Sequence, residues 1–136
     1  RWALFASPDY LASATAIDAP QALRHHACLQ FTPLGKEAWV LHDGAANSVT
    51  VSLARQTLIN DIGLIMTMVS AGGGVALLPS YLCRQACDEG RLVPVLPEWH
   101  GKADPIHIVY PRQRFMPPRL RAFVDLATLA LRQWLE

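Results

Sequence analysis

Residues 58–82 constrain the fold most, because a helix pattern, a run of glycines and a buried-strand pattern follow one another there. Four apolar residues recur at helical spacing: Ile62, Ile65, Met66 and Val69. The glycines at 72–74 permit a left-handed C-cap and a tight turn. Residues 75–78 are continuously apolar, as in a strand covered on both faces. Pro79 then suits the first turn of a following helix. The stretch predicts a layered domain with this strand at its centre.

The start of the predicted helix carries the first candidate site. Asn60 and Asp61 each suit the N-cap position, where a short side-chain oxygen accepts from a backbone N–H group. Unpaired N–H groups at a helix N-terminus beside a sheet attract a carboxylate or a similar anion. Two interpretations stay open here. The residues either only finish the helix, or they also contact a ligand.

Composition narrows the class of protein. The chain is 51% hydrophobic and 17% charged, which predicts either a well-covered sheet or a surface buried against another segment. Its net charge of +1 gives no electrostatic reason for this segment to bind nucleic acid. The three cysteines form no CxxC pair, which favours reduced thiols and a cytoplasmic protein. No apolar run is long enough for a membrane span. The chain begins at Arg1 with strand-like residues, which predicts a piece of a longer protein.

Strand and helix patterns alternate along the chain and predict an α/β layered domain. Strand patterns cover residues 2–6, 27–31, 38–42, 48–53, 75–78, 92–96 and 106–110. Helical patterns begin at Pro8, at Pro20, at Asn60 or Asp61, at Ser80 and at Pro118. Asp43 and Gly44 predict a turn that makes the strands on either side antiparallel. Pro94 indicates an edge or a bend in its strand, and residues 97–105 are predicted to form a loop.

No catalytic or metal-binding constellation is evident. A G-x-S-x-G elbow is absent. His42 lies in a strand pattern and His100 in a loop pattern, and without ligand spacing a hydrogen-bonded structural role is favoured over a metal site. Cys83 and Cys87 could flank a metal, but packing on one helix face is favoured. The glycines at 72–74 follow a helix and precede a strand, the reverse of a phosphate loop. We therefore expect neither an enzyme nor a cofactor.

Several phrases, in this order and spacing, resemble one known family. They are Ala6–Ala12 (ASPDYLA), Pro20–Phe31 (with its Pro, Leu, His, Cys, Leu and Phe), Asn60-Asp61, Ala71–Leu82 (AGGGVALLPSYL), Gly90–Leu96 (GRLVPVL), Val109–Pro111 (VYP) and Pro118–Asp125 (PRLRAFVD). Together they resemble the effector-binding domain of LysR-type transcriptional regulators over essentially the whole chain. The middle residue of the family's Gly-x-Gly is usually apolar. Gly73 departs from this pattern, which predicts a looser turn and the loss of a packing side chain.

The resemblance implies a periplasmic-binding-protein-like (type 2) fold, in which two α/β subdomains enclose a small effector. Residues 1–6 would then be the first crossover strand and residues 7–105 the second subdomain. Residues 106–136 would be the return crossover strand and the C-terminal helix of the first subdomain. The winged helix-turn-helix that binds DNA in this family, and most of the first subdomain, would lie outside this chain.

The resemblance also implies which residues contact the effector. In the family, a polar residue at the start of the helix after the alternating strand faces the cleft, which here is Asn60 with Asp61 beside it. The segment that enters the second subdomain, near Ser7 and Pro8, also borders the cleft. The negative charge of Asp61 would compete with an anionic effector for the same N–H groups.

The predicted function is therefore that of a small-molecule effector-sensing domain of a transcription regulator. Its partners would be the effector, further copies of the chain in a dimer or tetramer, and DNA through the absent N-terminal domain only. A solute-binding protein of a transporter, with the same general fold, is the alternative. The reduced-looking cysteines and the lack of an export signal count against that alternative.

Overall fold

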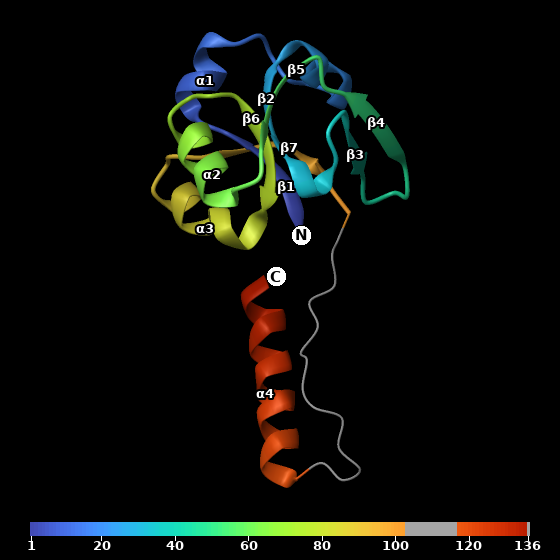
Figure 1. Cartoon of the computed structure of the whole chain (residues 1–136), viewed down its shortest axis with the longest axis vertical. Coiled ribbons are helices and arrows are strands. Elements are labelled where there is room, and N and C mark those ends of the chain that lie inside the picture. Colours follow the sequence, from blue (N-terminus) through green and yellow to red (C-terminus); the bar gives the residue numbers. More distant parts are fainter. Residues whose placement is uncertain (103–116, 136) are drawn as a thin grey trace. The chain divides into compact units, whose positions relative to one another are not determined.

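The computed structural model describes residues 1–102 and 117–135. The chain divides into two compact units, Arg1–Ala103 and Asp104–Glu136. Only the first unit contains a sheet among the described residues, and Figure 1 shows its strands and helices.

A mixed sheet of seven strands, in the order β4-β3-β7-β1-β6-β2-β5, forms the framework of the first unit. Its strands are β1 (Trp2–Ala6), β2 (Ala27–Phe31), β3 (Ala38–His42), β4 (Ser48–Ser52), β5 (Arg55–Ile59), β6 (Val75–Pro79) and β7 (Val93–His100). β2 runs parallel to β5 and to β6, whereas β1 runs antiparallel to β6 and to β7. The hairpin of β3 and β4 joins the sheet through a single pair, His42 with His100.

Short helices connect the strands. They are α1 (Pro8–Ser13), α2 (Ile62–Ser70) and α3 (Ser80–Asp88), with the 3-10 helices η1 (Pro20–His25) and η2 (Thr32–Leu34). α2 and α3 pack on one face of the sheet, where Ile65, Val69 and Cys83 meet Phe5 and Leu78 in a buried cluster. This arrangement confirms the predicted α/β class and the predicted inward face of α2.

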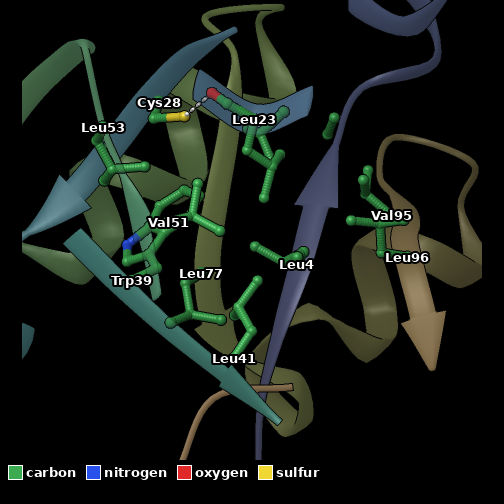
Figure 2. Packing of buried hydrophobic residues seen from close by; sticks show 12 residues of the cluster. Leu4, Leu23, Cys28, Trp39, Leu41, Val51, Leu53, Leu77, Val95 and Leu96 are labelled. Carbon is green, nitrogen blue, oxygen red and sulfur yellow. Dashed lines mark hydrogen bonds between the residues drawn. The ribbon is translucent and has the colours of Figure 1, made fainter. Parts of the chain in front are cut away.

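The opposite face of the sheet carries a second buried cluster, which Figure 2 shows in close view. Leu4 and Leu77 of the central strands meet Trp39 and Leu41 of β3, so the β3–β4 hairpin closes over this face. β6 is buried along its full length because both clusters lie against it. The sequence prediction of a strand covered on both faces at 75–78 is therefore confirmed.

The glycine turn after α2 has strict steric requirements. Gly72 and Gly74 have φ values of +90° and +139°. A Cβ on Gly74 would lie 2.3 Å from the carbonyl oxygen of Ala27, so β2 and β6 approach too closely for any side chain. A Cβ on Gly73 would lie 2.8 Å from the carbonyl oxygen of Met68, which already accepts from the Gly73 N–H group. A side chain at Gly73 would therefore require the backbone to shift, and the expectation that Gly73 loosens this turn stays a prediction.

Several local features differ from what the sequence predicts. β5 was not predicted, since Arg55–Ile59 is largely polar and becomes a strand by parallel pairing with β2. β7 runs on to His100, so residues 97–100 are strand rather than loop. Its register with β1 shifts between Ala3 and Leu4, and Leu96 takes a φ of +49°, which confirms a bend but not an edge position. Pro79 ends β6 as the N-cap of α3, one position before the predicted first turn.

The described part of the second unit is one long helix, α4 (Pro118–Leu135). It starts where the sequence predicts, at Pro118. Several of its large apolar side chains are exposed: Phe123, Leu126, Leu129 and Trp134. The predicted strand at 106–110 lies outside the described residues. The assignment of residues 1–6, 7–105 and 106–136 to crossover strands and subdomains stays a prediction.

Candidate functional site

The carboxyl ends of the parallel strands define one edge of the sheet. β2, β5 and β6 end at Phe31, Ile59 and Pro79, and the register of their pairing places these ends together. Segments that follow such strand ends form the ligand sites of open α/β sheets. We refer to this part of the molecule as the carboxyl edge.

Asn60 and Asp61 lie at the carboxyl edge, directly after β5 and before α2. Asp61 is the N-cap, and its Oδ1 accepts a hydrogen bond of 3.1 Å from the N–H group of Leu64. Asn60 is exposed, and its side-chain amide forms no hydrogen bond with other described residues. The two adjacent residues therefore differ in role. Asp61 is used by the helix, and Asn60 is available to a ligand.

Ser7 and Pro8 lie at the opposite edge of the sheet. β1 is antiparallel to β6, so the end of β1 lies beside the start of β6. Ser7 is 3% exposed, and its Oγ accepts from the N–H group of Tyr10 at 3.1 Å to cap α1. A Cβ on Gly72, beyond the last turn of α2, would lie 3.7 Å from this Oγ. Asn60 precedes the first turn of α2, a nine-residue helix about 13 Å long.

The structure thus brings Asn60 together with Asp61 and Ser7 together with Pro8, but it does not bring the two pairs together. Ser7 is committed to a helix cap, and Pro8 occupies the first position of α1. A role for Ser7 and Pro8 in effector binding stays a prediction.

Further residues at the carboxyl edge were missed by sequence reasoning. The rings of Trp2 and Phe31 stack with centroids 6.0 Å apart. The Ser80 N–H group, at the start of α3, donates to the carbonyl oxygen of Arg1 at 2.8 Å. Trp2 pairs with Pro79 across β1 and β6, which places the start of the chain at this edge. Only the strand order reveals these neighbours, because they are far apart in sequence.

A buried amide fixes the segment that follows β2. Gln30 is fully buried; its Nε2 donates to the carbonyl oxygen of Gly35 at 2.7 Å, and its Oε1 accepts from the indole N–H group of Trp39. Gln30 thereby ties the residues after η2 to β3. Because both ends of the amide are satisfied, burial of this polar side chain is compatible with a stable core.

A second polar cluster surrounds His26, which is 2% exposed. Its Nδ1 lies 2.8 Å from the hydroxyl of Tyr10, and its Nε2 lies 3.3 Å from the hydroxyl of Thr15. The Tyr10 hydroxyl also accepts from the Ala27 N–H group at 3.3 Å. Burial, followed by the charges of His25 and Arg55, lowers the pKa of His26 from 6.5. Both ring nitrogens are engaged, which indicates a structural role.

The cysteines are structural in this geometry. Cys28 and Cys83 are buried, and burial raises the pKa of each thiol to about 12. The Cys28 thiol donates to the carbonyl oxygen of Leu23 (Figure 2). Cys83 and Cys87 pack in the cluster beneath α3, as the sequence predicts. Among residues 1–102 and 117–135, no group of three or more His, Cys, Asp or Glu side chains is arranged to hold a metal ion.

Comparison with known proteins gives the family. The family model described as "LysR substrate binding domain" matches residues 1–132. The chain belongs to the LysR substrate-binding domain family. This LysR domain is 32% identical over 120 residues to the HTH-type transcriptional regulator PtxR of Pseudomonas aeruginosa, covering 88% of the chain and 38% of PtxR. It is 30% identical over 136 residues to the iron-regulated virulence regulatory protein IrgB of Vibrio cholerae, covering 98% of the chain and 44% of IrgB. The chain therefore spans about two fifths of the length of these relatives.

Solved structures show the same fold. The regulatory domain of AphB from Vibrio vulnificus superposes with a TM-score of 0.75 at 24% identity, over 95% of this chain and 64% of that chain. The CrgA regulatory domain from Neisseria meningitidis superposes with a TM-score of 0.64 at 29% identity, over 93% and 62%. The fold is thus the periplasmic-binding-protein-like fold of LysR regulatory domains, as predicted. Within the part of the chain that the structure describes, no helix has the length and apolar character needed to cross a bilayer.

Proposed function

We propose that this LysR domain is the effector-sensing part of a bacterial transcriptional regulator. Family membership over residues 1–132 carries the proposal, and the named relatives are transcriptional regulators rather than enzymes. The relatives are not transport proteins, so the comparisons give no support to the solute-binding alternative. In the proposed mechanism, the effector biases the arrangement of two subdomains, and homo-oligomer contacts carry that bias to DNA-binding domains outside this chain. The proposed location is the cytoplasm, where DNA is accessible.

Asn60 is the residue we propose to contact the effector. It lies at the carboxyl edge, its amide is free of hydrogen bonds to other described residues, and α2 begins two residues later. The amide offers both a donor and an acceptor, and the first N–H groups of α2 favour a carboxylate or another anion. Asp61 supplies an opposing negative charge in the same place. The proposed ligand class is therefore a small carboxylate whose affinity is moderated by Asp61.

The test is calorimetry on the full-length regulator, with small mono- and dicarboxylates first ranked by the rise in melting temperature that they cause. We expect Asn60→Ala to weaken binding of the best carboxylate at least tenfold, while DNA affinity without the carboxylate stays near the wild-type value. Asp61→Asn keeps an equally good N-cap and removes the charge, so it should strengthen binding. Gln21→Ala, an exposed polar substitution in η1, is the matched control. Unchanged affinity in Asn60→Ala would remove Asn60 from the site.

A further inference from the structure

Two histidines far apart in the sequence face one another where β3 joins the sheet. His42 ends β3, His100 ends β7, and they are the paired residues that link these strands. Their ring centroids are 6.4 Å apart and the ring planes are inclined by 36°. Both side chains are partly exposed, so solvent and ions reach them. Residues opposite one another on antiparallel strands project from the same face of a sheet, which keeps the two imidazoles together.

The neighbouring strands place this pair on a defined face. His100 is paired with Ala3 of β1 as well as with His42, and Ala3 is in turn paired with Leu78. Ala3 and Leu78 belong to the cluster covered by α2 and α3. These paired residues therefore form a row across the sheet, from the fully buried Leu78 beneath the helices to the partly exposed histidine pair.

The backbone holds His100 in the tautomer that a metal ligand needs. His100 Nδ1 lies 3.0 Å from the carbonyl oxygen of Gly101, and a carbonyl can only accept, so Nδ1 carries the proton. The lone pair of neutral His100 is consequently on Nε2. Metal-binding histidines are usually oriented in this way, with the other ring N–H group given to a carbonyl or carboxylate.

Gly101 is itself firmly placed. Its N–H group donates to the carbonyl oxygen of Trp2 at 2.9 Å. A Cβ on Gly101 would lie 3.0 Å from the Cβ of Trp2 and 3.2 Å from a methyl group of Leu77. The carbonyl that orients His100 is therefore fixed by strand pairing and close packing.

We propose that His42 and His100 form a two-histidine site for a divalent transition-metal ion of the zinc class. Imidazole suits zinc, nickel and copper, and zinc–nitrogen bonds of about 2.0–2.1 Å at a tetrahedral angle bring two ring centres to about 5 Å from one another. Side-chain rotation that closes a gap of roughly 1 Å is sufficient. The two remaining positions on the ion are open to water. With two protein ligands instead of three or four, the site binds the ion more weakly than a structural zinc site does.

The surroundings favour a cation. Asp43 follows His42, and its carboxylate interacts electrostatically with His100. Its oxygens already accept from the N–H groups of Ala45 and Asn47 and from the side-chain amide of Asn47. Asp43 therefore contributes negative charge near the pair, and the two-histidine site does not require it as a ligand. His26, the buried histidine that precedes β2, has both ring nitrogens engaged and is not a competing ligand.

The test is a calorimetric titration of the purified protein with Zn²⁺ alone. We expect one ion per chain, with binding at least tenfold weaker in His42→Gln and in His100→Gln. His25→Gln, which changes an exposed histidine outside the pair, is the matched control and should bind as the wild type does. Melting temperatures without metal check that each variant folds.

Nitrogen-15 spectra of the wild-type imidazoles give a second readout that needs no variant. Zn²⁺ is expected to shift Nε2 of His100 and one ring nitrogen of His42 together, and to leave His26 unchanged. The proposal is overturned if the wild type binds Zn²⁺ no more tightly than His42→Gln does, or if the ion shifts neither ring. Neither result bears on the effector site, because the titration contains no carboxylate.

Discussion

At the scale of single residues, His26 is a buried histidine whose two ring nitrogens both have hydroxyl partners. Nδ1 lies 2.8 Å from the Tyr10 hydroxyl, which also accepts from the Ala27 N–H group, and Nε2 lies 3.3 Å from the Thr15 hydroxyl. A hydroxyl can donate or accept, so these partners satisfy a neutral ring in either tautomer. Burial and the charges of His25 and Arg55 disfavour the protonated ring.

We predict that stability falls as the pH drops below about 6.5, the ordinary pKa of histidine. The pKa of His26 is lower in the folded protein than in the unfolded chain, so the unfolded chain takes up a proton first as the pH falls. The stabilising contribution of neutral His26 is therefore lost as the pH falls through the folded pKa. One such proton changes the free energy of unfolding by at most about 1.4 kcal/mol per pH unit. Urea unfolding at a series of pH values from about 5 to 8, the range in which histidine titrates, measures this change in the free energy of unfolding. A slope that His26→Gln leaves intact would contradict the prediction.

At the scale of elements, the connection from α2 to β6 depends on glycine for two separate reasons, a positive φ and a close backbone contact. Gly90, after α3, serves for comparison: glycine is needed there only for its φ of +74°, since a Cβ would meet nothing within 4 Å. Gly74 has both a φ of +139° and a neighbouring backbone carbonyl in the way. That carbonyl belongs to β2, so a side chain at Gly74 would separate two central strands.

We therefore predict that Gly74→Ala destabilises the protein by about 3 kcal/mol or more, because it combines backbone strain with a clash in the core. Gly90→Ala, the matched control, should cost about 1–2 kcal/mol, the cost of a left-handed conformation alone. Urea unfolding followed by circular dichroism measures both. An equal loss of unfolding free energy in the two variants would show that the clash between a side chain at Gly74 and β2 adds nothing to the cost of the backbone strain.

The elements that could be predicted from the sequence are those whose determinants are local. The apolar run of β6, the helical spacing of α2 and the prolines that start α1 and α4 are readable in short windows. β5 is not, because only Ile59 of this strand is buried and its conformation comes from pairing with β2. The same holds for the end of β7, where His100 is fixed by partners in β1 and β3.

The same limit applies to the candidate site: only its locally determined residues could be predicted from the sequence. Asn60 follows from a local helix start. Its distance from Ser7 does not, because it depends on the direction in which β1 runs beside β6. The pairing of His42 with His100 likewise requires the position of β7 between β1 and β3. Sequence patterns indicate what a residue can do locally, and the strand order decides which residues meet.

At the scale of the whole molecule, burial is unevenly distributed along the chain. Residues 1–102 enclose two apolar clusters on opposite faces of one sheet, and β6 belongs to both. In α4, none of the described side chains from Pro118 to Trp134 is buried. Opening β6 therefore exposes much apolar surface, whereas unwinding α4 exposes little. Local opening free energies follow this difference, because they rise with the apolar surface that must be exposed.

We predict that amide hydrogen exchange in the 136-residue chain separates the two units. The β6 amides should exchange only on global unfolding, while α4 amides should exchange at least a hundredfold faster, since most helical stability in proteins comes from packing of a buried face and none of the described α4 side chains is buried. Exchange measured by mass spectrometry on peptides from each element tests this. The β4 edge strand, which pairs on one side only, is the internal control and should fall between them. Equal protection of α4 and β6 would mean that the helix is stabilised by burial as extensive as that of the central strand.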